Sequence, residues 1–433
     1  MNSSHPDEGL KRVVGVRTLA INAVNMTIGA GIFALPALVA AEIGASAFLA
    51  YFVCTLLLGL VLLCFVEVGT KISTSGGAYA YIEEAFGPLA GFLTNTIFWL
   101  GFTALANAAV ANVMADNLAI FFPKLGEPVF RALFLIAVFG GLSWLNVQGS
   151  KESTTFVNVV TVLKLIPLLL LIVFGFAHMQ TENLQVTAWP SVQQLGEASL
   201  ILFFAFGGGA EATLSASGEI KNPTYTIPRG FLLGVLVVFL FYLAIQLVAQ
   251  GVLGDALAAE KEAPLGAVAS IVFGKQGLSF MALAAAVSCF GLISGDMFVS
   301  SRVPYAAARD GLLPSFLAKI HPKFSTPYFS IVLYASVSFL YAISGGFRQL
   351  AILSSASILL IYVGVIAATI KLRSRKVEGA YVNPGGLLIP VLALMATGWF
   401  LSNLAWKEIV AVIIFLAFFS IVYYIMKSFQ KKQ

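Results

Sequence analysis

The sequence predicts an all-α integral membrane protein with twelve transmembrane helices. Hydrophobic residues make up 59% of the 433 residues and charged residues only 10%, and the mean hydropathy is +0.93. About a quarter of the residues are charged in a typical soluble domain. Apolar runs also recur along the chain at about the 20 residues that a helix needs to cross a bilayer. These observations exclude a soluble globular protein.

The apolar runs define the positions of the twelve spans. Helices are expected because a membrane-spanning segment must satisfy its own backbone hydrogen bonds. The predicted spans cover residues 14–40, 43–70, 83–118, 130–146, 153–176, 195–218, 228–251, 265–300, 327–344, 349–371, 386–404 and 408–426. The third and eighth are long enough to tilt strongly in the bilayer.

The basic residues orient these spans. Eighteen Lys and Arg residues fall on the side that carries both chain ends, six fall on the other side, and Lys164 alone lies within a span. Because cytoplasmic loops carry the excess of basic residues, we expect a multi-pass protein of the cell membrane with both termini in the cytoplasm. The net charge of +5 follows from these loops, so no nucleic-acid partner is expected.

Glycines interrupt two of the predicted spans. Gly29-Ala30-Gly31 lies in the first span and Gly207-Gly208-Gly209 in the sixth. A helix broken in hydrocarbon is tolerated only where the freed backbone groups line a cavity or bind a ligand. Breaks at matching positions of two repeats indicate the binding site of a secondary transporter.

The spacing of the two breaks predicts an internal repeat. Five spans per repeat is an odd number, so the second repeat must enter the membrane from the opposite face. The predicted organisation is a cytoplasmic tail at 1–12, a first five-helix repeat at 13–176, an inverted repeat at 193–371, helices eleven and twelve at 385–427, and a cytoplasmic tail at 428–433.

The freed backbone groups at a helix break suit a zwitterionic amino acid. Free N–H groups attract a carboxylate, and free carbonyls attract an ammonium group. We expect the backbone of residues 29–31 to bind the carboxylate and the carbonyls near Phe203 and Phe206 to bind the ammonium. The alternative is that Gly-x-Gly only permits close helix packing. The predicted substrate-binding residues are Asn25, Thr27, Ile28, Gly29, Ala30, Gly31, Ile32, Phe203, Phe206, Gly207 and Gly208.

Polar residues at helical spacing mark two further helix faces. Asn22, Asn25 and Gly29 are three and four residues apart, which places them on one face of the first half-helix. That face should point to the interior of the bundle. In the third span a similar set recurs every four residues, at Asn95, Trp99, Thr103 and Asn107. The alternative for either stripe is hydrogen bonding between helices, which is the better explanation for any single asparagine.

Lys164 is the predicted coupling residue. An ionisable residue within a membrane helix is costly and marks a functional candidate. Desolvation disfavours its charged amine, which favours proton exchange. Two alternatives are a permanent ion pair with Glu67, Glu211 or Asp296, and extension of the side chain to the membrane surface.

The sequence offers little support for other chemistry. Three cysteines and three isolated histidines give neither a disulfide framework nor a metal cluster. The sequence lacks the phosphate-binding glycine loop that ATP-driven transport needs. Gly295-Asp296 resembles half of an intramembrane aspartyl protease dyad, but a second Asp in a matching context is missing from the sequence. We therefore expect no catalytic residues, no metal and no cofactor.

Four separated motifs resemble those of amino acid permeases of the amino acid-polyamine-organocation (APC) superfamily. In chain order they occupy residues 28–36, Glu67 with 75–81 and 86–88, 219–223 with 227–229, and 302–314. The resemblance covers nearly the whole chain. It implies the leucine-transporter-type fold, with two inverted five-helix repeats and substrate bound at the unwound centres of spans one and six.

The resemblance also bears on coupling and partners. Lys164, three residues before Pro167, is similar to the lysine that replaces bound sodium in proton-coupled permeases and amino acid exchangers. The implied function is sodium-independent amino acid transport, with protons as a candidate coupling ion. A polyamine or organic-cation transporter and a non-transporting channel or sensor remain alternatives. The outer loop at 121–128 lacks cysteine, so no disulfide-linked partner is expected and the chain should be a monomer or weak homo-oligomer.

Two departures from the family pattern concern the pocket. Ala30 stands where several relatives have serine, so only backbone amides remain there for a carboxylate. The sixth span has one more residue than usual between its aromatic residue and Glu211. Its three glycines remove side chains that would narrow the pocket, so a roomy side-chain subsite is expected.

Overall fold

The computed structural model describes residues 14–72, 77–149, 153–211, 220–375, 377 and 380–430, and the side chains of the helix that starts at Ser153 only from Lys164 onward. Sequence predictions on the tail at 1–12, on residues 75 and 76, on Glu219 and on the last three residues lie outside this part. All regular elements within it are helices, beside an isolated parallel bridge between Val14 and Ile220.

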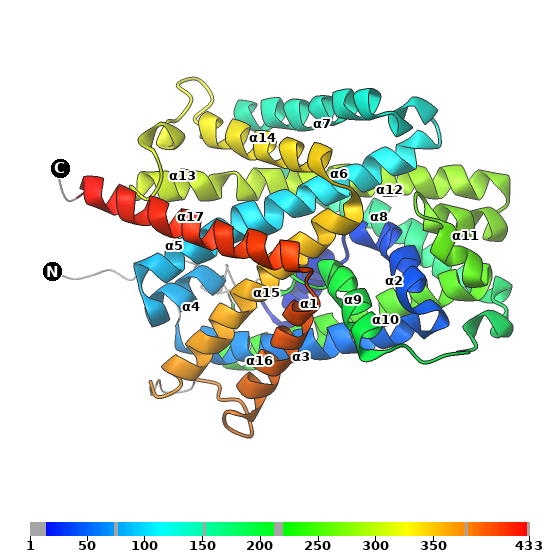
Figure 1. Cartoon of the computed structure of the whole chain (residues 1–433), viewed down its shortest axis with the longest axis horizontal. Coiled ribbons are helices and arrows are strands. Elements are labelled where there is room, and N and C mark those ends of the chain that lie inside the picture. Colours follow the sequence, from blue (N-terminus) through cyan, green and yellow to red (C-terminus); the bar gives the residue numbers. More distant parts are fainter. Residues whose placement is uncertain are drawn as a thin grey trace.

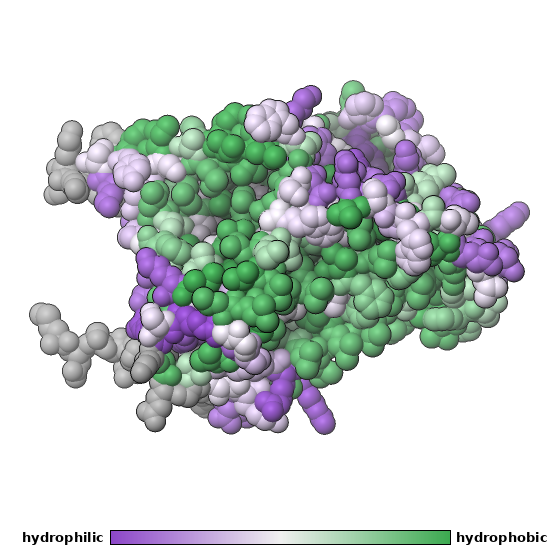
Figure 2. All heavy atoms as spheres, turned by 60° about the horizontal axis from the view of Figure 1, so that its bottom comes forward, coloured by the Kyte–Doolittle hydropathy of each residue, from purple (hydrophilic) through white to green (hydrophobic). Residues whose placement is uncertain are grey.

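The described helices support a multi-pass membrane protein. Seven helical runs there are long and apolar enough to cross a bilayer: Leu35–Lys71, Pro88–Ala119, Pro128–Gln148, Thr224–Ala259, Lys275–Arg309, Phe347–Leu372 and Trp406–Ser428. Four shorter apolar helices accompany them, at Lys164–His178, Val192–Ala205, Tyr328–Ser344 and Leu388–Ser402. Figure 2 shows a face with a broad hydrophobic area, and with hydrophilic residues at both ends and over part of its upper half. The predicted all-helical membrane class is confirmed.

Many of the long helices run roughly along the longest axis of the molecule (Figure 1). In chain order the α-helices are α1 (Val16–Thr27), α2 (Leu35–Ile43), α3 (Phe48–Lys71), α4 (Gly77–Phe86), α5 (Pro88–Thr96), α6 (Ala104–Ala119), α7 (Pro128–Gln148), α8 (Ser153–Gly175), α9 (Val192–Leu202), α10 (Pro223–Leu253), α11 (Pro264–Val272), α12 (Lys275–Ser300), α13 (Arg302–Arg309), α14 (Tyr328–Ser344), α15 (Phe347–Leu372), α16 (Leu388–Ser402) and α17 (Trp406–Gln430). Most predicted span ends lie within a few residues of these bounds.

Two predicted spans begin too early, at 83 and at 265. Gly87, with φ +87°, separates α4 from α5, and Gly274, with φ +73°, separates α11 from α12. A right-handed helix cannot contain a residue with positive φ, which glycine adopts without steric cost. Hydropathy averaged over a window does not detect such a single-residue turn.

Continuous helices surround the two interrupted ones. The half-helix α1 packs against α10, and α12 packs against both α6 and α8. Tyrosines and phenylalanines fill the space between them, and Tyr51, Phe65, Tyr242, Tyr334 and Tyr362 are fully buried. The interrupted helices are therefore held inside a packed bundle.

A buried ionic cluster ties the end of α3 to the segment after α15. The carboxylate of Glu67 is fully buried and lies 3.8 Å from Lys71 Nζ and 3.4 Å from Arg373 Nε. Its other oxygen accepts a hydrogen bond from the Asn383 amide at 3.0 Å. Lys71 Nζ also donates to the carbonyls of Leu372 and Arg373. Glu67 is thus paired with two cations and one amide at this end of the bundle.

Candidate functional site

The first break has the form that its glycines predict. Helix α1 ends at Thr27, and Ile28 and Gly29 are extended, with ψ values of 91° and −169°. A short 3₁₀ turn, Ala30–Phe33, leads into α2 at Leu35. The chain therefore leaves the helix within the bundle, and backbone groups on both sides of the break lose their helical partners.

The second break follows α9. After Leu202 the chain makes a 3₁₀ turn, Phe203–Ala205, and Gly208 has φ +84°. The Phe203 carbonyl already accepts hydrogen bonds from the amides of Phe206 (3.0 Å) and Gly207 (2.8 Å). A Cβ atom at Gly208 would overlap the ring of Phe102. Glycine is required here by both its conformation and the available space.

The two breaks lie side by side. The Tyr242 hydroxyl on α10 lies 2.7 Å from the Thr27 carbonyl oxygen and 3.3 Å from the Ala205 carbonyl oxygen, so it can donate to either break. A Cβ atom at Gly209 would lie 2.8 Å from Thr27 Cα. The glycine run in the sixth span therefore lets its backbone approach the first break closely.

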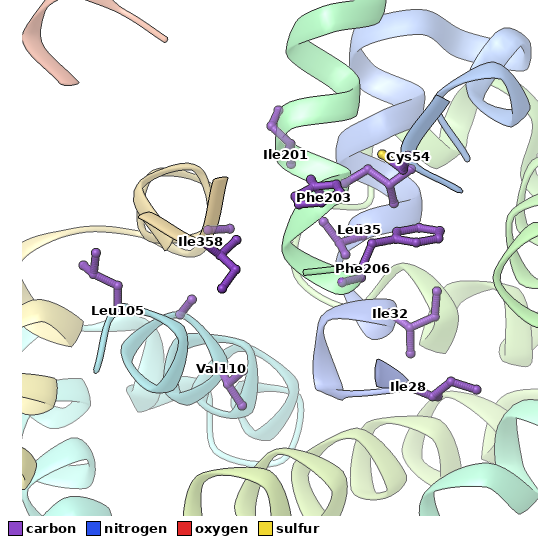
Figure 3. Packing of buried hydrophobic residues seen from close by; sticks show 14 of the residues in the cluster. Ile28, Ile32, Leu35, Cys54, Leu105, Val110, Ile201, Phe203, Phe206 and Ile358 are labelled. Atoms are coloured by element: carbon purple, nitrogen blue, oxygen red, sulfur yellow. The ribbon is translucent and has the colours of Figure 1, made fainter. Parts of the chain in front are cut away.

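A cavity of about 700 Å³ lies between the breaks, a size suited to a small molecule. The predicted site residues on its wall are Asn25, Thr27, Gly29, Gly31, Gly207, Gly208 and Lys164. The side chains of Ile28, Ile32, Phe203 and Phe206 are instead buried in the core. Figure 3 shows Phe203 and Phe206 near Leu35 and Cys54.

Three details qualify the predicted site. The role predicted for Phe203 and Phe206 concerns their backbone carbonyls, and the burial of their side chains does not test it. The side chain of Ala30 lies outside the described part. Asn22 was expected to face the interior with Asn25, but its side chain is exposed.

Lys164, on α8, lies beside the C-terminal end of the half-helix α1. Its Nζ donates a hydrogen bond of 3.1 Å to the Asn25 carbonyl in the last turn of α1. A positive charge at a helix C-terminus is stabilising because the helix dipole and the free carbonyls are negative there. Within the described residues, no carboxylate lies within 4.0 Å of Lys164, so none of the three acids suggested as its ion-pair partner has that role.

The polar stripe of the third span only partly faces the cavity. Asn95, Thr103 and Asn107 lie on the wall, whereas Trp99 is buried in the core. The middle of this span, Ile97–Thr103, is π-helical. A π-helix closes its hydrogen bonds one residue later than an α-helix, so a strict four-residue period cannot hold through it.

Glu211 holds the second break together. Its Oε1 accepts a hydrogen bond from the Gly208 amide (2.8 Å) and another from the Tyr362 hydroxyl on α15. The Gly208 amide also lies 3.1 Å from the Tyr362 oxygen. Sequence reasoning considered Glu211 only as a partner of Lys164, because the contact with α15 joins residues far apart in the chain.

Asp296 forms a second polar cluster on the wall. Its Oδ2 accepts hydrogen bonds from the Tyr334 hydroxyl (2.6 Å) and Asn107 Nδ2 (2.8 Å). Its Oδ1 accepts one from Ser300 Oγ (2.9 Å). The available sequence signal was the presence of two polar residues, Asn107 and Asp296, inside otherwise apolar spans. Sequence reasoning did not pair them.

Helix α1 breaks and resumes as α2, and α9 gives way to turns at the second glycine run. The two breaks meet at an internal cavity inside an all-helical membrane bundle, and this arrangement defines a membrane transporter for a small molecule. The chain belongs to the amino acid permease family of the APC superfamily, which matches residues 14–431. The resemblance drawn from the four motifs is thereby confirmed.

Three bacterial relatives align with almost the whole chain, all from Bacillus subtilis (strain 168). The branched-chain amino acid permease BcaP is 27% identical, over 97% of this chain and 94% of the relative. The serine/threonine exchanger SteT is 28% identical, over 92% of each. A methylthioribose transporter is 26% identical, over 98% and 95%. The family thus includes carriers of different small molecules.

Proposed function

We propose that this protein moves amino acids across the cell membrane by alternating access, without sodium, either in symport with protons or by exchange. The observation that carries the proposal is the cavity at which two interrupted helices meet, with Lys164 capping the first of them. Free N–H groups and free carbonyl groups at the same site suit a zwitterion better than a molecule with one charge.

We propose the following arrangement around this site. The chain crosses the membrane twelve times, with both termini cytoplasmic, as two inverted five-helix repeats at 13–176 and 193–371 of the leucine-transporter type. Helices eleven and twelve, at 385–427, stand outside the repeat. The close approach of the two breaks, one from each proposed repeat, supports this arrangement.

The proposed substrate contacts follow from the backbone. The amides of residues 29–31 bind the carboxylate, in the turn that leads into α2. Carbonyls of the second break bind the ammonium. Because the Phe203 carbonyl already accepts two amides, Phe206 is the stronger of the two proposed contacts.

Lys164 is the proposed coupling residue. An ammonium group that already bonds to the Asn25 carbonyl supplies a positive charge beside the first break. A sodium ion at the same place would be repelled by that charge. We therefore propose sodium-independent transport in which Lys164 links α8 to α1.

Uptake into proteoliposomes tests the proposal. The substrates are the twenty common amino acids and several polyamines, with and without an imposed pH gradient and with and without sodium. We expect saturable uptake of at least one amino acid that competes only with compounds carrying both a carboxylate and an amine. Tight competition by amines without a carboxylate would favour an organic-cation carrier. Unsaturable flux would indicate a channel.

A further inference from the structure

The cluster around Asp296 is not explained by the proposed contacts at the two breaks. It is built from three helices, with Asp296 and Ser300 on α12, Asn107 on α6 and Tyr334 on α14. Asp296, Asn107 and Ser300 belong to the cavity wall. Each described hydrogen-bonding partner of the carboxylate is neutral, and no described cation lies within ion-pair distance of it.

This cluster holds acceptors within the cavity wall that lack matching donors. An ionised carboxylate has about four lone-pair sites, and the described donors to Asp296 occupy three of them. Asn107 turns its amide nitrogen to Asp296, because an ionised carboxylate can only accept hydrogen bonds. The amide oxygen of Asn107 must therefore point away from Asp296. That oxygen, Asn107 Oδ1, is buried and lacks a hydrogen-bond partner among the described residues. The two acceptors complement a group that carries several N–H donors.

The charges on the cavity wall favour a cation. Among the described wall residues, the side chains that are charged in their ordinary ionisation state are Lys164, Glu211 and Asp296. Lys164 is engaged with Asn25 at the first break, and Glu211 with Tyr362 at the second. The wall therefore carries one more negative than positive charge, in surroundings where charges are only weakly screened. A positively charged ligand group restores the balance.

The cluster lies within reach of a substrate side chain. Leu292 on α12 touches the first break, since a Cβ atom at Gly29 would lie 2.9 Å from Leu292 Cδ1. Asp296 is four residues further along the same helix, which is about 6 Å. A lysine side chain extends about 6 Å from its Cα, because it contains five bonds of about 1.5 Å in zigzag. An amino acid with its carboxylate on the first break can thus place a terminal amine at Asp296.

We infer that Asp296 and Asn107 form a subsite for the cationic end of a substrate side chain, so that the protein prefers cationic amino acids such as lysine, ornithine and arginine. This inference rests on the proposed function of the cavity. It assigns the substrate class that the two helix breaks alone leave open.

Competition between matched compounds tests the inference. The measurement is inhibition of the uptake of a labelled amino acid that the protein transports. The inhibition by L-lysine is compared with that by L-norleucine, and the inhibition by L-arginine with that by L-citrulline. The two members of each pair have similar shapes but different charges. We expect the cationic member to bind at least tenfold more tightly in the unaltered protein. Equal or tighter binding of the neutral members would overturn the inference, and this measurement requires no variant.

Variants test whether Asp296 is responsible for the preference for cationic amino acids. Asp296→Asn should reduce the preference for lysine over norleucine, measured as the ratio of the two affinities in the same variant, at least tenfold. Glu84→Gln is the control, because it makes the same chemical change in an exposed ion pair with Arg375. An unchanged preference in folded Asp296→Asn would overturn the inference. The inference would also be overturned if Asp296→Asn kept the preference for lysine over norleucine but changed the response of uptake to a pH gradient. That result would make Asp296 a proton-binding residue.

A diamine separates this inference from the proposed function. Cadaverine has the terminal amine of lysine without the carboxylate. If cadaverine competes as well as lysine, the proposed binding of a substrate carboxylate at the first break is contradicted. If neutral amino acids are transported and lysine has no advantage, only the Asp296 subsite fails.

Discussion

Replacing Lys164 with methionine tests how the protein couples its helices. The change keeps a long side chain but removes the ammonium that bonds to the Asn25 carbonyl at 3.1 Å. A hydrogen bond to a charged group contributes about 1.5–3 kcal/mol. Because Lys164 faces the cavity and water can partly replace it, we take the lower end. With 1.36 kcal/mol per factor of ten, uptake by Lys164→Met should slow by about tenfold or more.

The assay is uptake into proteoliposomes with and without an inward proton gradient. If Lys164 releases its proton during the cycle, the gradient accelerates the unaltered protein and Lys164→Met loses that acceleration. If the lysine stays charged, exchange of internal for external substrate shows no dependence on the gradient, yet the variant still slows it. Lys275→Met is the control, since Lys275 is exposed at the start of α12. Sodium-dependent uptake, or a variant with ordinary rates and gradient response, would refute the reasoning.

The remaining predictions concern the two breaks. Gly31→Leu should abolish uptake while the protein still elutes as a folded species from gel filtration, because the side chain fills the proposed carboxylate site; unchanged affinity would contradict that placement. Gly208→Ala should lower the melting temperature in detergent, since alanine disfavours φ +84° by about 1–2 kcal/mol and also meets an aromatic ring; Gly59→Ala, in open space within α3, is the control and should not lower it. Tyr242→Phe should cost about 1–3 kcal/mol in the free energy of unfolding, because a buried carbonyl loses its donor; a change below about 0.5 kcal/mol would show that the hydroxyl is dispensable. In a substrate panel, large amino acids should compete better than glycine, and the tightest binding by glycine or alanine would contradict the roomy subsite.

The sequence predicts the broken helices well because their cause is local. Glycines in an apolar run indicate where a helix stops, and the structure has breaks at both runs. The family motifs are local too. By contrast, the turns at Gly87 and Gly274 were missed, because a window of 20 apolar residues averages over one residue with positive φ.

The composition of the site was harder to predict. A 3₁₀ turn rotates successive side chains differently from an α-helix, so Ile32 and Phe203 point into the core while neighbouring residues line the cavity. Ile28, in extended backbone before the first turn, and Phe206, directly after the second, are buried as well. The cluster at Asp296 depends on the packing of three helices that are distant in sequence. No spacing rule within one helix brings such residues together.

The Tyr242 hydroxyl has one hydrogen and two carbonyl acceptors, at 2.7 Å on Thr27 and 3.3 Å on Ala205. If the first break moves away from α10 in the proposed alternating-access cycle, that hydrogen can turn to the other acceptor and stay paired. A buried donor stranded midway would add about 1–3 kcal/mol to the barrier. Sharing one hydrogen between two segments would therefore let them slide past each other with a smaller barrier, and the rate of that change would depend on a hydroxyl group that bonds to backbone on both sides.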